Sequence, residues 1–366
     1  MNQIFVKSLR GDYRILVGEH LLEEAGSILK TLGLKGKILI VTQERVARFH
    51  LNPVEKSLRN AGFRLGVHRV ADGEVAKSPR ELERLYNTLV HHGFERRDTI
   101  LALGGGVVGD LAGFAASSYL RGVLFVNAGT TLLAQVDSSI GGKTGINLEA
   151  GKNLVGAFYP PRLVISDVGV LATLSERELT SSMGEAVKYG VIRDVRLFRL
   201  LEKEGEKVFD KDPAFFKKIV LASARIKAAV VSRDEFEIKG ERMILNFGHT
   251  FGHAFEQALH YRKLMHGEAV AVGMACAARL AVHLRICSPA CEGRLCALLQ
   301  KLHLPVSLSG LDLETARILE AMTYDKKKRG GDLRFVLPTR IGQVVIRDRI
   351  PRHLVKKVIH ESGGIP

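Results

Sequence analysis

The first third of the chain alternates short apolar segments with stretches of helical periodicity. Residues 3–9 and 13–17 alternate apolar and polar side chains on either side of Gly11-Asp12, which predicts a hairpin. The run 38–42, and the run 98–103 after its first residue Asp98, are apolar or uncharged and predict strands that are covered on both faces. Helices are predicted at 21–32, 46–61 with a break at Pro53, and 80–92, and a further strand at 63–70. This order is typical of a parallel sheet with helical crossovers.

The pattern changes after a short strand at 163–167. Ser175-x-x-Glu178 has the spacing of a capping box and predicts the start of a helix that carries Glu185. Further helices are predicted at 213–231, 244–261, 267–285, 289–303 and 313–324, and a hairpin at 333–337 and 343–346. We therefore predict an α/β domain at 1–172, with a parallel and non-standard Rossmann-like sheet, and a mainly α-helical domain at 173–366.

Composition narrows the class of protein. A chain of 366 residues that is 46% hydrophobic can build a substantial core in each of two domains. The N-terminus has no basic and apolar signal sequence, and the longest apolar run, 269–284, carries Arg279 and His283. Four cysteines without a CxxC pair indicate reduced thiols. We expect a cytoplasmic protein that is not bound to a membrane.

The charge of the chain indicates anionic ligands. Lys and Arg number 54 against 39 acidic residues, a formal net charge of +15. These cations are spread along the chain, and no RNP-like aromatic pattern, helix-turn-helix signature or basic tail accompanies them. We therefore expect a small anionic ligand and no nucleic acid.

A glycine-rich turn follows the predicted strand at 98–103. Gly104-Gly105-Gly106-Val107-Val108-Gly109-Asp110 leads into a helix of small residues and has the spacing of the dinucleotide fingerprint. Backbone N–H groups in such a turn can bind a diphosphate. The acidic residue expected about twenty positions later is missing, since that segment reads Leu-Phe-Val-Asn127. The segment predicts either a diphosphate loop of a non-standard α/β fold or a turn that serves helix–sheet packing.

A second polar, glycine-rich segment spans 130–153. It contains Asp137, Gly142-Lys143-Thr144 and Gly151-Lys152-Asn153. A P-loop is excluded because its first glycine would fall at position 137, which is Asp. The many donors predict an anion site, with a solvated loop as the alternative.

Histidines at helical spacing predict a metal site. His249 and His253 are four residues apart and share one face of a helix, and His266 follows after a turn. Two imidazoles and a carboxylate, with Glu185 as the best candidate, make a zinc site with an open coordination position. Spacing alone favours His249 and His253, and two ordinary helix histidines are the alternative.

Taken together, these motifs resemble the 3-dehydroquinate synthase family of the sugar-phosphate cyclase group. The matching segments are 72–77, 104–110, 130–137, 141–145, 151–153, 184–190, 246–253 and 266–268. The resemblance implies an NAD-binding N-terminal domain, a helical domain that binds one divalent metal, zinc or cobalt, and a homodimer.

The resemblance also implies roles for individual residues. The metal ligands would be Glu185, His249 and His266, so that His253 becomes a substrate contact. NAD contacts are implied at Asp72, Gly73, Glu74, Lys77, Gly106, Val107, Val108, Gly109, Asp110, Thr130, Thr131, Lys143, Lys152 and Thr173. Catalytic roles are implied for Lys143, Asp137, Lys188, His253 and Asn246. Further substrate contacts are implied for Asn153, Lys227, Arg242, Lys326 or Lys327, and for Arg121 reaching the partner subunit's site.

Two segments depart from the family pattern. Gln43 stands where the family has an acidic residue after the first long strand, and Glu44 is one position late. Ala128-Gly129 replaces an apolar residue and proline before Thr130. The first change removes the acid expected to contact the adenosine ribose, and the second is expected to loosen the loop.

The implied reaction converts 3-deoxy-D-arabino-heptulosonate 7-phosphate to 3-dehydroquinate and phosphate, a lyase step of the shikimate pathway. Elimination of phosphate needs an acidic C–H beside the leaving group, which transient oxidation of the neighbouring alcohol by NAD provides. The alternatives are a sister cyclase such as 2-deoxy-scyllo-inosose synthase, a metal-dependent alcohol or polyol dehydrogenase, and a binding protein without catalysis.

Overall fold

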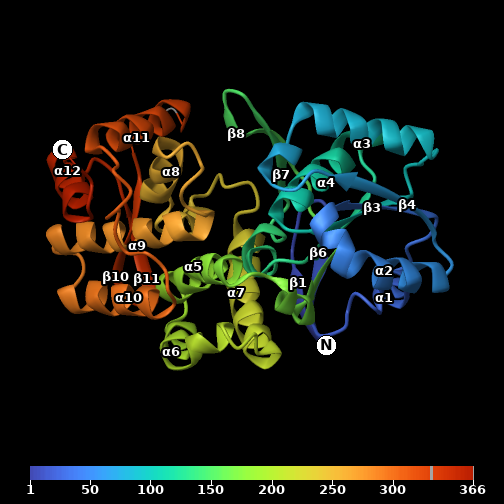
Figure 1. Cartoon of the computed structure of the whole chain (residues 1–366), viewed down its shortest axis with the longest axis horizontal. Coiled ribbons are helices and arrows are strands. Elements are labelled where there is room, and N and C mark those ends of the chain that lie inside the picture. The colour runs from blue at the N-terminus through green and yellow to red at the C-terminus, as the bar shows by residue number, and fades with distance from the viewer. Residues whose placement is uncertain (330–332, 366) are drawn as a thin grey trace. The chain divides into compact units, whose positions relative to one another are not determined.

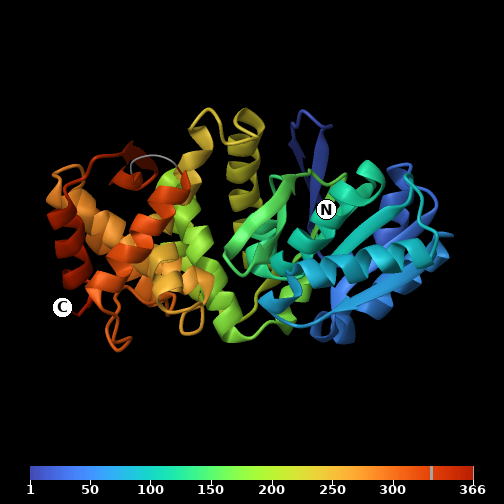
Figure 2. The same ribbon diagram turned by 90° about the horizontal axis from the view of Figure 1, so that it is seen from above.

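The structure, a computed structural model, describes residues 1–329 and 333–365, with side chains described for 1–323 and 333–365. The chain forms two compact units. The first contains Met1–Ser175 and Lys211–Phe236, and the second contains Glu176–Asp210 and Glu237–Pro366. Helix α7 (Pro213–Arg233) thus belongs to the first unit, where it packs beside β1 and β2 (Figure 2). The division predicted at 172/173 did not include this excursion of the chain.

A seven-stranded sheet organises the first unit, in the order β1-β2-β9-β6-β5-β3-β4. The strands are β1 (Asn2–Val6), β2 (Tyr13–Gly18), β3 (Lys37–Gln43), β4 (Arg64–Val70), β5 (Thr99–Gly104), β6 (Leu124–Gly129) and β9 (Leu163–Asp167). β1 pairs antiparallel with β2, and the other pairings of this sheet are parallel. The predicted hairpin and parallel α/β sheet are therefore confirmed.

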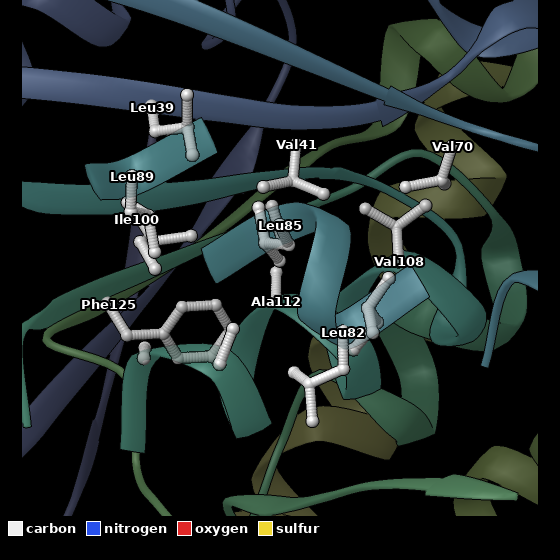
Figure 3. Packing of buried hydrophobic residues seen from close by; sticks show 14 of the residues in the cluster. Leu39, Val41, Val70, Leu82, Leu85, Leu89, Ile100, Val108, Ala112 and Phe125 are labelled. Atoms are coloured by element: carbon white, nitrogen blue, oxygen red, sulfur yellow. The ribbon is translucent and has the colours of Figure 1, made fainter. Parts of the chain in front are cut away.

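Helices cover both faces of this sheet (Figure 1). They are α1 (Ala25–Thr31), α2 (Glu44–Asn60), α3 (Pro79–His91) and α4 (Gly106–Ser118). On one face, Leu85 of α3 and Ala112 of α4 pack against Leu39 and Ile100 of the central strands (Figure 3). Ile40, which points to the opposite face, is also fully buried. Burial on both faces explains why β3 and β5 have no polar alternation.

Pro53 does not break its helix, contrary to our prediction. α2 runs without interruption from Glu44 to Asn60. Pro53 lies on the less buried side of the helix, while Leu51, Val54 and Leu58 are buried. The cost of a proline in a helix interior is about 3 kcal/mol, and burial of this apolar face outweighs it.

The later part of the polar loop predicted at 130–153 belongs to a second hairpin, which spans 143–158. β7 (Lys143–Leu148) pairs antiparallel with β8 (Gly151–Phe158), and β7 packs against α4. Glycine is depleted in strands, so the glycines of this segment concealed the pairing. Asp137 lies just before it, in a π-helical turn labelled η3 (Ala134–Ser138).

The second unit is mainly helical, as predicted. Its elements are α5 (Glu176–Ile192), α6 (Val195–Glu204), η5 (Gly205–Val208), η6 (Glu241–Asn246), α8 (His249–Ala258), α9 (His266–His283), α10 (Pro289–Lys301), α11 (Thr315–Arg329), β10 (Phe335–Arg340), β11 (Gln343–Arg347) and α12 (Arg352–Glu361). α9 is the central helix and contacts α5, α8, α10, α12 and β10. No helix among the described residues is long and apolar enough to cross a membrane.

The cysteines of this unit should be chemically inert in the folded protein. Cys276, Cys287 and Cys291 are buried, and burial raises the pKa of the Cys276 thiol to about 11 and of the Cys287 thiol to about 12. Because the thiolate is the reactive form, we expect at most Cys296 to react with a disulfide reagent within minutes at pH 8. All four thiols should react after denaturation. Rapid reaction of two or more thiols in the native protein would contradict this assignment.

Candidate functional site

Close contact between helix backbones brings three candidate ligands together. Gly184 of α5 faces Gly267 of α9, where a methyl group on Gly184 would lie 2.6 Å from the Gly267 carbonyl oxygen. A methyl group on Gly248 would lie 2.6 Å from Met274 Cγ and 2.8 Å from the Val270 carbonyl oxygen, both in α9. Each glycine is next in sequence to a candidate ligand, since Glu185 follows Gly184, His266 precedes Gly267 and His249 follows Gly248.

The helix predicted at 244–261 is interrupted at Gly248. Residues Glu241–Asn246 form the short helix η6, Phe247 and Gly248 form a turn, and Gly248 has φ of 80°, which favours glycine. α8 then begins at His249. The break makes His249 the first residue of a new helix, at the contact with α9.

Glu185, His249 and His266 form a compact cluster. The Nε2 atom of His249 is 3.6 Å from Glu185 Oε1, and the Nε2 atom of His266 is 3.7 Å from the same oxygen. One candidate ligand atom from each residue lies within 4.8 Å of the other two. A divalent cation takes such ligands at about 2.0–2.2 Å, so the cluster needs only a small contraction to surround one.

The ring nitrogens of both histidines are oriented for coordination. His249 Nδ1 is 3.1 Å from the Phe247 carbonyl oxygen, which can only accept a hydrogen bond. His266 Nδ1 is 3.3 Å from Glu256 Oε2. When Nδ1 donates to such an acceptor, Nε2 is the nitrogen that can bind a cation, and in both rings Nε2 lies on the side of Glu185.

The pKa values of the two imidazoles are shifted in opposite directions. Burial, with the positive charge of Lys188 as a further cause, holds the pKa of His249 well below its usual range. Burial also acts to lower the pKa of His266, but hydrogen bonds to Glu185 and Glu256 raise it to about 10. A metal ion bound at the Nε2 atoms would displace the proton that the nearby carboxylates stabilise on His266 when no metal is bound.

Lys188 and His253 are two other predicted residues of this unit for which a contact with the cluster is observed. Lys188 is buried and forms an ion pair with Glu185. The His253 ring is 5.2 Å from that of His249, but His253 does not belong to the set of ligand atoms around Glu185. Arg242 is buried in η6, and Asn246 Nδ2 is 3.4 Å from Glu237 Oε1. Lys326 and Lys327 fall where the structure does not describe side chains.

In the first unit, the glycine-rich turn lies where the strand order reverses. The chain runs from β3 to β4 on one side of β3 and returns as β5 on its other side. Ligands of open α/β sheets bind beyond the carboxyl ends of strands at such a switch point. The Gly104-Gly105-Gly106 turn and the N-terminus of α4 are at this position, which favours the diphosphate interpretation. Packing alone accounts for Gly109, where a methyl group would lie 2.9 Å from Asn127 Nδ2.

Three predicted cofactor or substrate contacts lie around a fourth, Lys77. Lys77 Nζ is 2.6 Å from Asp110 Oδ2 and 3.7 Å from Glu74 Oε1, and it also donates to Asn153 Oδ1. Burial raises the pKa of Asp110 to about 6, although Lys77 acts to lower it. Asn147, which sequence reasoning missed, donates to Glu74 and accepts from the Asn153 N–H, so it ties β7 and β8 to this group.

A second polar group in this unit joins Asp137 to Lys227. Lys227 Nζ is 2.8 Å from Asp137 Oδ1 and donates to the Asp137 carbonyl oxygen at 2.8 Å. Lys227 is buried in α7. It belongs to this group because the segment 211–236 is part of the first unit. Asp137 owes its position to the π-helical turn, a feature that is frequent at functional sites.

The remaining predicted contacts of the first unit are distributed along its loops and strand ends. The Thr130 N–H donates to Gly104 O, Thr131 Oγ1 accepts from the Ala134 N–H, and Asp72 Oδ1 accepts from the Arg45 N–H. Gly73 precedes η1 (Glu74–Ala76), Val107 and Val108 lie in the first turn of α4, Lys143 and Lys152 lie on β7 and β8, and Arg121 is exposed in η2 (Tyr119–Arg121). Gln43 Nε2 donates to the Ala71 carbonyl oxygen.

Thr173 has a partner that sequence reasoning missed. Its hydroxyl donates to the Val170 carbonyl oxygen at 2.8 Å and lies 3.1 Å from His50 Nε2. His50 is buried in α2, and no local pattern links it to Thr173 across 123 residues.

Models of two protein families match adjacent parts of the chain. The model described as the 3-dehydroquinate synthase N-terminal domain matches residues 67–181, and the C-terminal domain of the same enzyme matches residues 182–328. A curated 3-dehydroquinate synthase from Picosynechococcus sp. is 44% identical over 349 residues, which cover 95% of each chain. The chain belongs to the 3-dehydroquinate synthase family.

Two solved structures that resemble this family member are sugar-phosphate cyclases. One is 2-epi-5-epi-valiolone synthase from Streptomyces hygroscopicus subsp. jinggangensis 5008 with NAD+ and Zn2+ bound, with a TM-score of 0.89, 29% identity, and coverage of 97% of this chain and 98% of the other. Another is 2-deoxy-scyllo-inosose synthase complexed with carbaglucose-6-phosphate, NAD+ and Co2+, with a TM-score of 0.88, 27% identity, and coverage of 99% and 100%. The backbone of this chain is thus similar to that of two enzymes whose structures contain NAD+ and a divalent metal.

The contact between α8 and α9 can be tested with matched glycine substitutions. Gly273→Ala would place a methyl group against the Gly248 carbonyl oxygen and 2.8 Å from the Gly252 nitrogen. We expect the free energy of unfolding to fall by about 1–3 kcal/mol, measured by urea denaturation. Gly293→Ala is the control, because a methyl group there has no atom within 4 Å, and it should stabilise α10 by about 0.5–1 kcal/mol. Equal stability of the two variants would show that the backbones are not in close contact.

Proposed function

We propose that this chain is a 3-dehydroquinate synthase, an NAD- and metal-dependent lyase that converts 3-deoxy-D-arabino-heptulosonate 7-phosphate to 3-dehydroquinate and phosphate. The observation that carries the proposal is the 44% identity to a curated 3-dehydroquinate synthase along 95% of the chain. The sister cyclases are less similar in sequence, at 29% and 27% identity. We also propose that the enzyme acts in the cytoplasm as a homodimer, as the family resemblance implies.

The residues present fit a divalent metal and a dinucleotide. Glu185, His249 and His266 supply one carboxylate and two imidazole nitrogens, the donor set of many catalytic zinc sites. Both imidazoles have their Nδ1 atoms engaged, so Nε2 is the coordinating atom in each. For NAD, the turn before α4 offers backbone N–H groups to the diphosphate. Cobalt suits the same ligands as zinc, and either metal is consistent with the proposal.

When bound, NAD takes a hydride from a substrate alcohol and later returns it, and the metal polarises the oxygen of that alcohol. The chain's own side chains bind, orient and move protons. Lys188 forms an ion pair with Glu185 and keeps its carboxylate oriented. We assign proton transfer to His253, because its ring lies edge-on to that of His249 and an imidazole can both accept and donate a proton.

The charged ends of the substrate would be bound by different cations. We assign its carboxylate to Arg242 and Lys227, because a guanidinium matches the two oxygens of a planar group and an ammonium adds a point charge. We assign its phosphate to Lys143, Asn153, Asn246 and the lysines at 326 and 327. Lys227 also orients the Asp137 carboxylate, to which we assign contact with substrate hydroxyl groups.

A comparison of three sugars tests the substrate assignment. With NAD and Zn2+ or Co2+, the purified protein should release phosphate from the heptulosonate 7-phosphate and not from glucose 6-phosphate or sedoheptulose 7-phosphate. The hydride returns in each cycle, so absorbance at 340 nm should show no accumulation of NADH. Phosphate release from glucose 6-phosphate alone would reassign the chain to the sister cyclases, and accumulating NADH would reassign it to the dehydrogenases.

The metal ligands can be tested by metal content. His249→Ala should remove bound zinc and turnover together, because it deletes one of three proposed protein ligands. His283→Ala is the matched control, since His283 lies at the far end of α9 and pairs with Glu361 at 2.7 Å. Elemental analysis of both dialysed variants provides the measurement. Full zinc retention by His249→Ala would exclude the proposed ligand set.

A further inference from the structure

The His266 ring lies between two carboxylates of the second unit. Its Nε2 atom is 3.7 Å from Glu185 Oε1, and its Nδ1 atom is 3.3 Å from Glu256 Oε2. Glu256 is 7% exposed and belongs to α8, whereas His266 is the first residue of α9. Each ring nitrogen therefore has its own acidic partner, and the two partners come from different helices.

Helical spacing brings Glu256 to this position. His249, His253 and Glu256 are separated by four and then three residues, so they share one face of α8. His249 begins this face and lies beside Glu185, and Glu256 lies about two turns later beside the other nitrogen of His266. One short helix thus supplies a candidate metal ligand and the partner of a second ligand.

The hydrogen bond at Nδ1 determines what Nε2 can do. A neutral imidazole has one N–H donor and one nitrogen with a free lone pair. A carboxylate at Nδ1 keeps the proton there, holds the ring in one orientation and increases the basicity of Nε2. We infer that Glu256 is a positioning residue for His266, which accepts the Nδ1 hydrogen bond and so holds Nε2 toward Glu185 and His249. The inference rests on the metal site of the proposed function.

Glu256 also changes the charge of the cluster. His249 has a neutral partner, the Phe247 carbonyl oxygen, whereas the partner of His266 carries a full charge. Glu185 forms an ion pair with Lys188, and Glu256 is a second acid at this cluster, from a different helix.

A second arrangement of the same residues competes with this inference. His253, Glu256 and His266 also offer ligand atoms that lie within 4.8 Å of one another. A cation held by these three would use His266 Nδ1, the atom that donates to Glu256 in our inference. One nitrogen cannot both keep its proton and bind a metal, so the two arrangements exclude each other.

The affinity of the full chain for Zn2+ tests the inference. Glu256→Gln keeps the size of the side chain and removes its charge, and we expect Zn2+ to bind about 10–100-fold more weakly in competition with a chromophoric chelator. Glu361→Gln is the matched control, because it neutralises a carboxylate that pairs with His283 in α9. We expect its Zn2+ affinity to stay within about twofold of the original chain, since this pair has no contact with the cluster.

Two more variants separate positioning from a general structural role. Glu256→Asp retains the charge, so its Zn2+ affinity should lie between those of the original chain and Glu256→Gln; equal affinities for the two variants would overturn the inference, even if one is less stable. His253→Ala should leave the Zn2+ affinity within about twofold of the original. A loss in His253→Ala as large as in Glu256→Gln would assign the cation to the competing set.

The remaining outcomes distinguish this inference from the proposed function. An original chain that binds no divalent metal would overturn both. If Glu256→Gln binds Zn2+ as tightly as the original chain, only the role of Glu256 is overturned. The ligand set of Glu185, His249 and His266 would then stand.

Discussion

The contact of helix backbones at glycines is the constraint on which the cluster of Glu185, His249 and His266 depends. Gly184 against Gly267, and Gly248 against α9, let three helices approach to distances that any side chain would prevent. Glu185, His249 and His266 are next to these glycines, so their side chains converge without a loop to carry them. The same contact explains why α9 is built from small apolar residues that are almost all buried. Rigid helices are better supports for a metal site than loops, because their positions vary less.

The polar groups of each unit follow from how its elements are packed. In the second unit, backbone and carboxylate partners at Nδ1 turn both imidazoles toward one glutamate. In the first unit, the reversal of strand order places a glycine turn and a helix N-terminus at one edge of the sheet. Lys77 and Lys227 are buried cations there, and each is paired with an aspartate. Buried charges need such partners, because desolvation of an isolated ammonium costs several kcal/mol or more.

Much of the fold was predictable, because the long apolar runs and the N-terminal caps of the helices are local signals. The interruption at Gly248 was not, since glycine is tolerated in helices and only the contact with α9 requires the left-handed backbone. The β7–β8 hairpin was hidden by its glycines, and helices α6 and α12 were not predicted. At the site, spacing alone favoured His253, whereas His266 lies beside Glu185 because α8 and α9 meet there. His50 contacts Thr173 across 123 residues, for which the sequence has no local pattern, and the contact of Glu256 with His266 depends on where α8 and α9 meet.

The central claim is that Glu185, His249 and His266 together hold one divalent metal ion. X-ray absorption at the zinc edge of the purified protein tests it most directly, because it reports the atoms bound to the metal. The account predicts nitrogen and oxygen neighbours at about 2.0–2.2 Å, with the outer-shell scattering of two imidazoles. Sulfur neighbours at about 2.3 Å, which would point to the cysteines, or the signal of a single imidazole, would contradict it.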